Sequence, residues 1–135
     1  FLAQDRYDQL LWACDVNFVR GEDSFVRAQW AGRPFVWNIY PTDDGAHWIK
    51  MGAFLARYTE PLERAQAGAV ASLWQAWNRR PADEGKVTPP LAESWAGFIA
   101  RRDGIAAHAR AWAERLRSQR GLADQLVDFA ENALK

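Results

Sequence analysis

The chain has 135 residues, one cysteine and eight tryptophans, and its 17 basic and 17 acidic residues give a formal net charge of zero. This length is typical of one domain with a buried core, and the balanced charge argues against a general affinity for nucleic acid or an anionic membrane. The single cysteine, Cys14, excludes an internal disulfide and suits a cytoplasmic protein. Neither a membrane span nor a secretion signal is expected, and a first residue other than methionine suggests part of a longer protein.

The first 40 residues predict one β-α-β unit. Apolar residues indicate a strand over residues 13–19 and a second strand over residues 34–40. Between them, residues 23–31 predict a helix that ends at Gly32. The two strands should be parallel, so their carboxyl ends should meet at one edge of a sheet, where ligands bind in open α/β folds.

The rest of the chain is predicted to be helical. Apolar residues repeat near the helical period over residues 46–58, 61–79, 91–102 and 105–120, and Leu122, Leu126 and Phe129 mark a last helix. Asp103 and Gly104 predict a break between two of these helices, and the proline-rich residues 81–90 predict a linker. The tryptophans are scattered over several elements, which favours packing roles over base stacking.

An Arg-Gly-Glu-Asp-Ser segment, residues 20–24, connects the first predicted strand to its helix. Backbone N–H groups at a helix start, together with the helix dipole, favour an anion such as phosphate. Arg20 precedes this loop, and Tyr40 ends the second strand at the same edge. The alternative is a helix cap, in which Asp23 or Ser24 accepts hydrogen bonds from the first-turn amides and Glu22 favours the dipole.

Other kinds of site have little support in the sequence. His47 and His108 lie far apart, and neither has a Cys, His or Glu neighbour at metal-ligand spacing, so no metal site is expected. The glycine-rich dinucleotide motif, the P-loop and the nucleophile elbow of α/β-hydrolases are all missing from the sequence.

Several segments resemble the family of protein-arginine rhamnosyltransferases that modify translation elongation factor P. They are Phe1-Leu2, residues 4–12 (Gln-Asp-Arg-Tyr-Asp-Gln-Leu-Leu-Trp), residues 17–30 around Arg-Gly-Glu-Asp-Ser, Pro-Phe-Val-Trp at 34–37 and Ile-Tyr-Pro at 39–41. The similarity is dense as far as about Leu55 and diffuse in the helical tail.

This resemblance implies an α/β fold that forms part of the C-terminal Rossmann-like domain of a GT-B glycosyltransferase. Such an enzyme would transfer L-rhamnose from dTDP-β-L-rhamnose to an arginine side chain of elongation factor P, with inversion and without a metal. Residues 1–57 would form the donor-site region and residues 58–135 a helical region, and the N-terminal acceptor domain would be absent. The expected partners are elongation factor P and the nucleotide sugar.

The resemblance also assigns roles to individual residues. Phe1 and Gln4 would lie on the thymine side of the donor. Glu22 is a candidate catalytic residue on electrostatic grounds: a carboxylate beside a diphosphate is repelled unless it points away, so we expect it to address the rhamnose hydroxyls or the acceptor guanidinium. The residues around the diphosphate would be Arg20, Asp23, Ser24 and Tyr40. Two alternatives remain: a GT-B-like nucleotide-sugar epimerase using the same anion loop, and a non-catalytic helical interaction domain.

Overall fold

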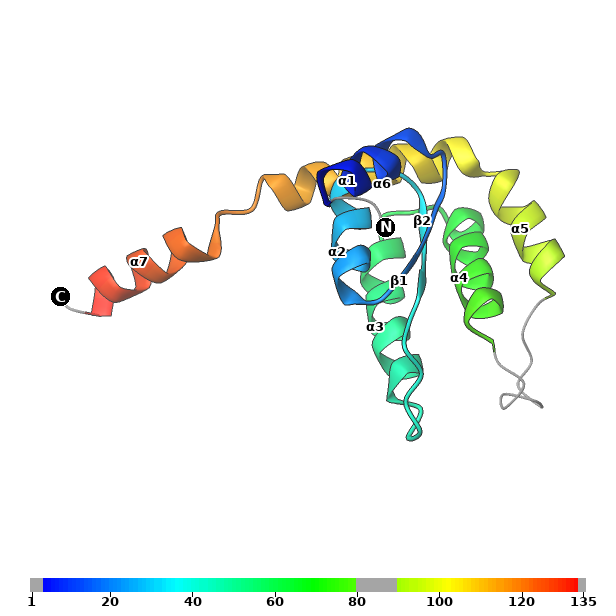
Figure 1. Cartoon of the computed structure of the whole chain (residues 1–135), viewed down its shortest axis with the longest axis horizontal. Coiled ribbons are helices and arrows are strands. Elements are labelled where there is room, and N and C mark those ends of the chain that lie inside the picture. The colour runs from blue at the N-terminus through cyan, green and yellow to red at the C-terminus, as the bar shows by residue number, and fades with distance from the viewer. Residues whose placement is uncertain (1–3, 80–89, 134–135) are drawn as a thin grey trace.

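A two-stranded parallel sheet lies at the centre of the fold (Figure 1). The computed structural model describes residues 4–79 and 90–133. Strand β1 (Asn17–Arg20) pairs with β2 (Phe35–Asn38), and helix α2 (Glu22–Ala31) connects them. Gly32 ends α2 in the left-handed conformation, with φ of 66°. The predicted parallel β-α-β unit is therefore confirmed.

The chain reaches β1 through a helix that the sequence analysis did not predict. Helix α1 (Gln4–Ala13) ends where the first strand was predicted to begin, so the start of that strand at residue 13 is wrong. Tyr7 and Leu11, four residues apart, pack on the core from one face of α1, which is a helical spacing. Asn17 Nδ2 then donates to the Leu11 carbonyl at 2.9 Å and joins the end of α1 to the strand.

Five further described helices follow the β-α-β unit. They are α3 (Ala46–Thr59), α4 (Arg64–Asn78), α5 (Leu91–Ile99), α6 (Arg102–Arg117) and α7 (Leu122–Ala133). Figure 1 shows α2 and α3 on one side of the strands and α4 and α5 on the other, while α6 crosses near α1 and α7 extends away from the other helices. No helix among the described residues is long and apolar enough to cross a membrane.

Two predicted helix boundaries are wrong. Helix α4 begins at Arg64 and not at Pro61, and the predicted break at Asp103 and Gly104 lies inside α6. The chain breaks instead at residues 100–101, between α5 and α6. A Cβ atom at Gly104 would collide with the side chain of Gln66, so this glycine permits a close approach and does not end a helix. The predicted linker lies almost wholly outside the described residues.

Buried hydrogen bonds fix α4 to the second strand. Trp74 Nε1 donates to the Phe35 carbonyl at 2.9 Å. Asn78 Nδ2 donates to the Trp37 carbonyl at 2.7 Å, and its Oδ1 accepts from the Ile39 amide at 2.9 Å. These bonds satisfy backbone groups of the first and third residues of β2 and of the residue that follows the strand, so the core sets the position of β2 and of the segment after it.

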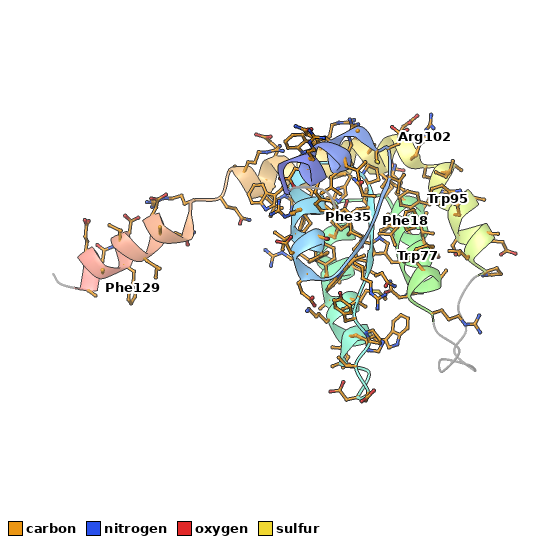
Figure 2. The ribbon with its side chains drawn as sticks, in the orientation of Figure 1. Phe18, Phe35, Trp77, Trp95, Arg102 and Phe129 are labelled. Carbon is orange, nitrogen blue, oxygen red and sulfur yellow. The ribbon has the colours of Figure 1, made fainter. Side chains whose placement is uncertain are left out.

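The tryptophans divide between the core and the surface. Trp37 and Trp74 are buried, as the packing prediction requires. Trp77 and Trp95 are each 39% exposed and lie beside Phe18 of β1, with ring-centroid distances of 4.6 Å and 5.9 Å from Phe18 (Figure 2). These three side chains form an aromatic cluster on the α4 and α5 side of the sheet.

Candidate functional site

The turn between β1 and α2 is a single residue, Gly21. Its φ of 81° and ψ of 169° lie in a region that is essentially restricted to glycine. The loop predicted over residues 20–24 is therefore shorter than expected, because Glu22, Asp23 and Ser24 already form the first turn of α2. Arg20 at the strand end and the first amides of the helix are consequently only one residue apart.

Tyr40 covers this turn from a position two residues beyond β2, so the predicted extension of the second strand to residue 40 is wrong. A Cβ built at Gly21 would lie 3.3 Å from Tyr40 Cε2 and 3.5 Å from its hydroxyl oxygen. The guanidinium carbon of Arg20 lies 5.0 Å from the centroid of the Tyr40 ring, within cation–π range. Both side chains are exposed. The parallel pairing thus brings together the two residues that the sequence places at the strand ends.

The start of α2 has no side-chain cap. The first backbone bond of the helix runs from the Phe25 amide to the Gly21 carbonyl at 3.1 Å, and no side-chain hydrogen bond caps Gly21. The capping role considered for Asp23 is not observed, because its carboxylate accepts from Arg27 Nε at 2.9 Å. The amides of residues 22–24 precede the first intrahelical bond, so they can serve as donors to an anion.

Each acidic residue at this helix start has a basic partner. Glu22 Oε1 lies 3.3 Å from Lys50 Nζ on α3. Arg27 binds Asp8 of α1 through Nη1 and Asp23 through Nε, both at 2.9 Å. The hydrogen bonds that Arg27 donates to Asp8 and, as the second contribution, to Asp23 raise the pKa of Arg27 above its ordinary value. Each of these carboxylates is therefore in contact with a basic side chain.

The side chain of Trp37 holds the β1–α2 turn through a hydrogen bond, a role that the sequence analysis missed. This buried residue of β2 donates from Nε1 to the Gly21 carbonyl at 3.1 Å. Phe25 of α2 stacks on its ring with a centroid distance of 4.0 Å, and Lys50 Nζ lies 5.3 Å from the ring centroid. Lys50 was missed as well, because 28 residues separate it from Glu22 and no local spacing connects them.

The segment after Tyr40 is held by its own hydrogen bonds. The Thr42 amide donates to His47 Nδ1 at 3.0 Å, and the Ala46 amide donates to Asp44 Oδ1 at 3.0 Å. Hydrogen bonds from the Thr42 side chain and the Ala46 amide lower the pKa of Asp44 below its ordinary value. Asp44 therefore orders the start of α3.

Comparisons with known proteins identify the family. The family model described as Elongation-Factor P (EF-P) rhamnosyltransferase EarP matches residues 1–131. The chain belongs to this family. It is 46% identical over 134 residues to a protein-arginine rhamnosyltransferase of Pseudomonas putida, and 44% identical over 129 residues to that of Pseudomonas aeruginosa. These alignments cover 99% and 96% of this chain, but only 33% and 32% of the relatives.

A solved structure supports the same assignment. It concerns EarP-mediated arginine glycosylation of translation elongation factor EF-P, and it matches this chain with a TM-score of 0.78 and 41% sequence identity. The match covers 98% of this chain and 39% of the other. This chain of the EarP family therefore spans about a third of the length of the curated relatives it matches.

Two residues assigned by the EarP resemblance cannot be placed in the site. Phe1 lies outside the described residues, and Gln4 begins α1 but its side chain is not among those described. Their thymine-side roles remain predictions. Among the described residues, no group of three or more His, Cys, Asp and Glu side chains could hold a metal ion.

Proposed function

We propose that this chain forms the donor-binding part of an inverting glycosyltransferase. The full-length protein would transfer L-rhamnose from dTDP-β-L-rhamnose to an arginine side chain of elongation factor P. The donor site would lie in a Rossmann-like domain of a GT-B enzyme that works in the cytoplasm. Membership of the EarP family supports the reaction, and the geometry of the β1–α2 turn supports the place of the donor.

One observation carries the assignment of the donor diphosphate. Arg20, the ring of Tyr40 and the first-turn amides of α2 meet at the carboxyl edge of two parallel strands. Breaking the sugar–phosphate bond leaves negative charge on dTDP, and donors fixed in advance stabilise charge that develops in the transition state. In this proposal Arg20 and the amides of Asp23 and Ser24 supply those donors, without a metal ion.

The reaction itself is a single displacement at the anomeric carbon. A guanidino nitrogen of the acceptor forms a bond to that carbon, the bond to the dTDP oxygen breaks, and the nitrogen loses a proton. A guanidinium with a pKa above ~12 is a poor nucleophile, so carboxylates must orient and polarise it. We assign part of this work to Glu22 and the rest to residues elsewhere in the full-length protein.

Mass spectrometry of elongation factor P tests the proposal. The full-length protein, incubated with elongation factor P and dTDP-β-L-rhamnose, should add the mass of one rhamnosyl group, and replacing the acceptor arginine by lysine should abolish the gain. The isolated 135-residue chain should transfer nothing. Conversion of the nucleotide sugar in the absence of elongation factor P would favour the epimerase alternative. A full-length protein that neither transfers rhamnose nor binds dTDP would favour a non-catalytic interaction domain.

A further inference from the structure

Lys50 of α3 reaches across to the first residue of α2. Its ammonium lies 3.3 Å from Glu22 Oε1 and 5.3 Å from the centroid of the Trp37 ring. The Lys50 and Glu22 side chains are each 58% exposed. Three elements, α2, α3 and β2, therefore meet at this ion pair, which lies beside the β1–α2 turn.

The position of Glu22 raises an electrostatic difficulty for the proposed site. A carboxylate in the first turn of α2 is close to the amides that would receive a diphosphate, and like charges repel. A cation in contact with that carboxylate reduces the repulsion. It also restricts the directions in which the Glu22 side chain can point.

We propose that Lys50 is a positioning residue that holds the Glu22 carboxylate for the transfer reaction. This inference rests on the proposed function, because it gives Lys50 a role only if Glu22 acts in transfer. Lys50 acts through Glu22 and is not itself assigned a contact with donor or acceptor.

Trp37 explains why Lys50 can hold a fixed position. A lysine side chain loses rotamer freedom when it is ordered, so an exposed lysine is usually mobile. Here the ammonium rests over the indole of a buried tryptophan, which attracts a cation through its ring face. The same indole donates to the Gly21 carbonyl at 3.1 Å. One rigid side chain therefore supports both the turn and the lysine.

The competing interpretation is an ordinary surface ion pair. Exposed pairs contribute little to stability, so a purely structural Lys50 would leave turnover unchanged when its charge is removed. A double-mutant cycle separates the two interpretations, because residues that act as a unit have non-additive effects on turnover.

The cycle uses the full-length protein and four variants: Lys50→Met, Lys50→Arg, Glu22→Gln and the double variant Lys50→Met with Glu22→Gln. Methionine keeps an unbranched apolar side chain over Trp37, and arginine restores a cation. Arg57→Met is the matched control, since it removes an exposed basic residue from the last turn of the same helix. The measurements are kcat and KM for rhamnose transfer, dTDP affinity by calorimetry, and circular dichroism to check the fold.

We expect Lys50→Met to lower kcat roughly three- to thirtyfold, which lies within the range of couplings between contacting residues. Its dTDP affinity should fall by no more than about fivefold, because Glu22 then lacks its exposed cationic partner beside the diphosphate, and the double variant should regain that affinity. Lys50→Arg should recover most of the turnover, and Arg57→Met should match the wild type. In the Glu22→Gln background, Lys50→Met should have no further effect.

Additive effects in the cycle would overturn the proposal, as would wild-type turnover in Lys50→Met. A large loss of dTDP affinity in Lys50→Met that persists in the double variant would overturn it too, since that result would place Lys50 on the nucleotide and not on Glu22. If wild-type protein bearing an intact Lys50 and Glu22 transfers no rhamnose at all, the proposed function itself has failed.

Discussion

Replacing Gly21 by alanine should damage both the fold and the site. Gly21 has φ of 81° and ψ of 169°, a combination that other residues adopt at a cost of about 1–3 kcal/mol. The new Cβ would also lie 3.3 Å from Tyr40 Cε2. Because Tyr40 is 51% exposed, its ring can move aside, and we expect the backbone conformation to dominate the cost.

The size of the effect follows from two opposing contributions. Alanine restricts the unfolded chain more than glycine does, which stabilises the folded state by about 0.4–1 kcal/mol. Taking the middle of both ranges, the net loss in the free energy of unfolding is about 1.3 kcal/mol. Displacement of the Tyr40 ring should weaken dTDP binding as well, because that ring lies beside Arg20.

Urea unfolding of the full-length protein, followed by tryptophan fluorescence, measures the loss. At a slope of about 2 kcal/mol per molar, this loss lowers the urea midpoint by roughly 0.7 M. Gly52→Ala is the matched control: Gly52 is an exposed residue of α3 with open space around its Cβ position, so alanine should stabilise by about 0.5–1 kcal/mol. The two substitutions should therefore change the free energy of unfolding in opposite directions. A Gly21→Ala protein as stable as the wild type would refute the reasoning.

Three further predictions concern the anion site and the core. Arg20→Ala should weaken dTDP binding by roughly ten- to a hundredfold, as expected when a charge-assisted contact worth about 1.5–3 kcal/mol is lost, and unchanged calorimetric affinity with an intact fold would contradict its role. Ser24→Pro removes a first-turn amide and should weaken dTDP binding, whereas Ser24→Ala keeps the amide and should not; equal affinities would exclude that amide as a donor. Burial lowers the pKa of His108 below its ordinary value of 6.5. As the pH falls, the His108 side chain therefore binds a proton at a higher pH in the unfolded chain than in the folded chain, so stability should fall as the pH drops below about 6.5. His108→Gln should flatten the decline in Tm between pH 7.5 and 5.5.

Local patterns in the sequence were enough to predict the β-α-β unit. Glycine at residue 32, apolar residues in the strands and the polar segment between them are all short-range signals. Helix α1 was missed because its apolar residues run into those that precede β1, and a short apolar stretch does not by itself separate helix from strand. Gly104 was misinterpreted for a related reason: only the packing of α6 against Gln66 shows that this glycine permits a contact.

Only the part of the candidate site whose position follows from the parallel pairing of the two strands could be predicted from the sequence. Parallel pairing placed Arg20 and Tyr40 at one edge, and the structure brings their side chains together. The hydrogen bond of Trp37 to Gly21 and the ion pair of Lys50 depend on side-chain directions in three dimensions. No spacing in the sequence encodes them, because the partners lie on elements whose relative positions are set by the core.

Charge pairing removes an electrostatic objection to proposing an anion site in a segment that has two carboxylates. Taken alone, Arg-Gly-Glu-Asp-Ser carries one more negative than positive group. In the folded chain, Glu22 is paired with Lys50, while Asp23 shares Arg27 with a carboxylate of α1. Arg20 is then a cation with no carboxylate partner among the described residues, and it is held only against the ring of Tyr40. A diphosphate placed there would meet the Arg20 guanidinium and the first-turn amides of α2, while Glu22 and Asp23 each already contact a cation, Lys50 of α3 and Arg27 of α2.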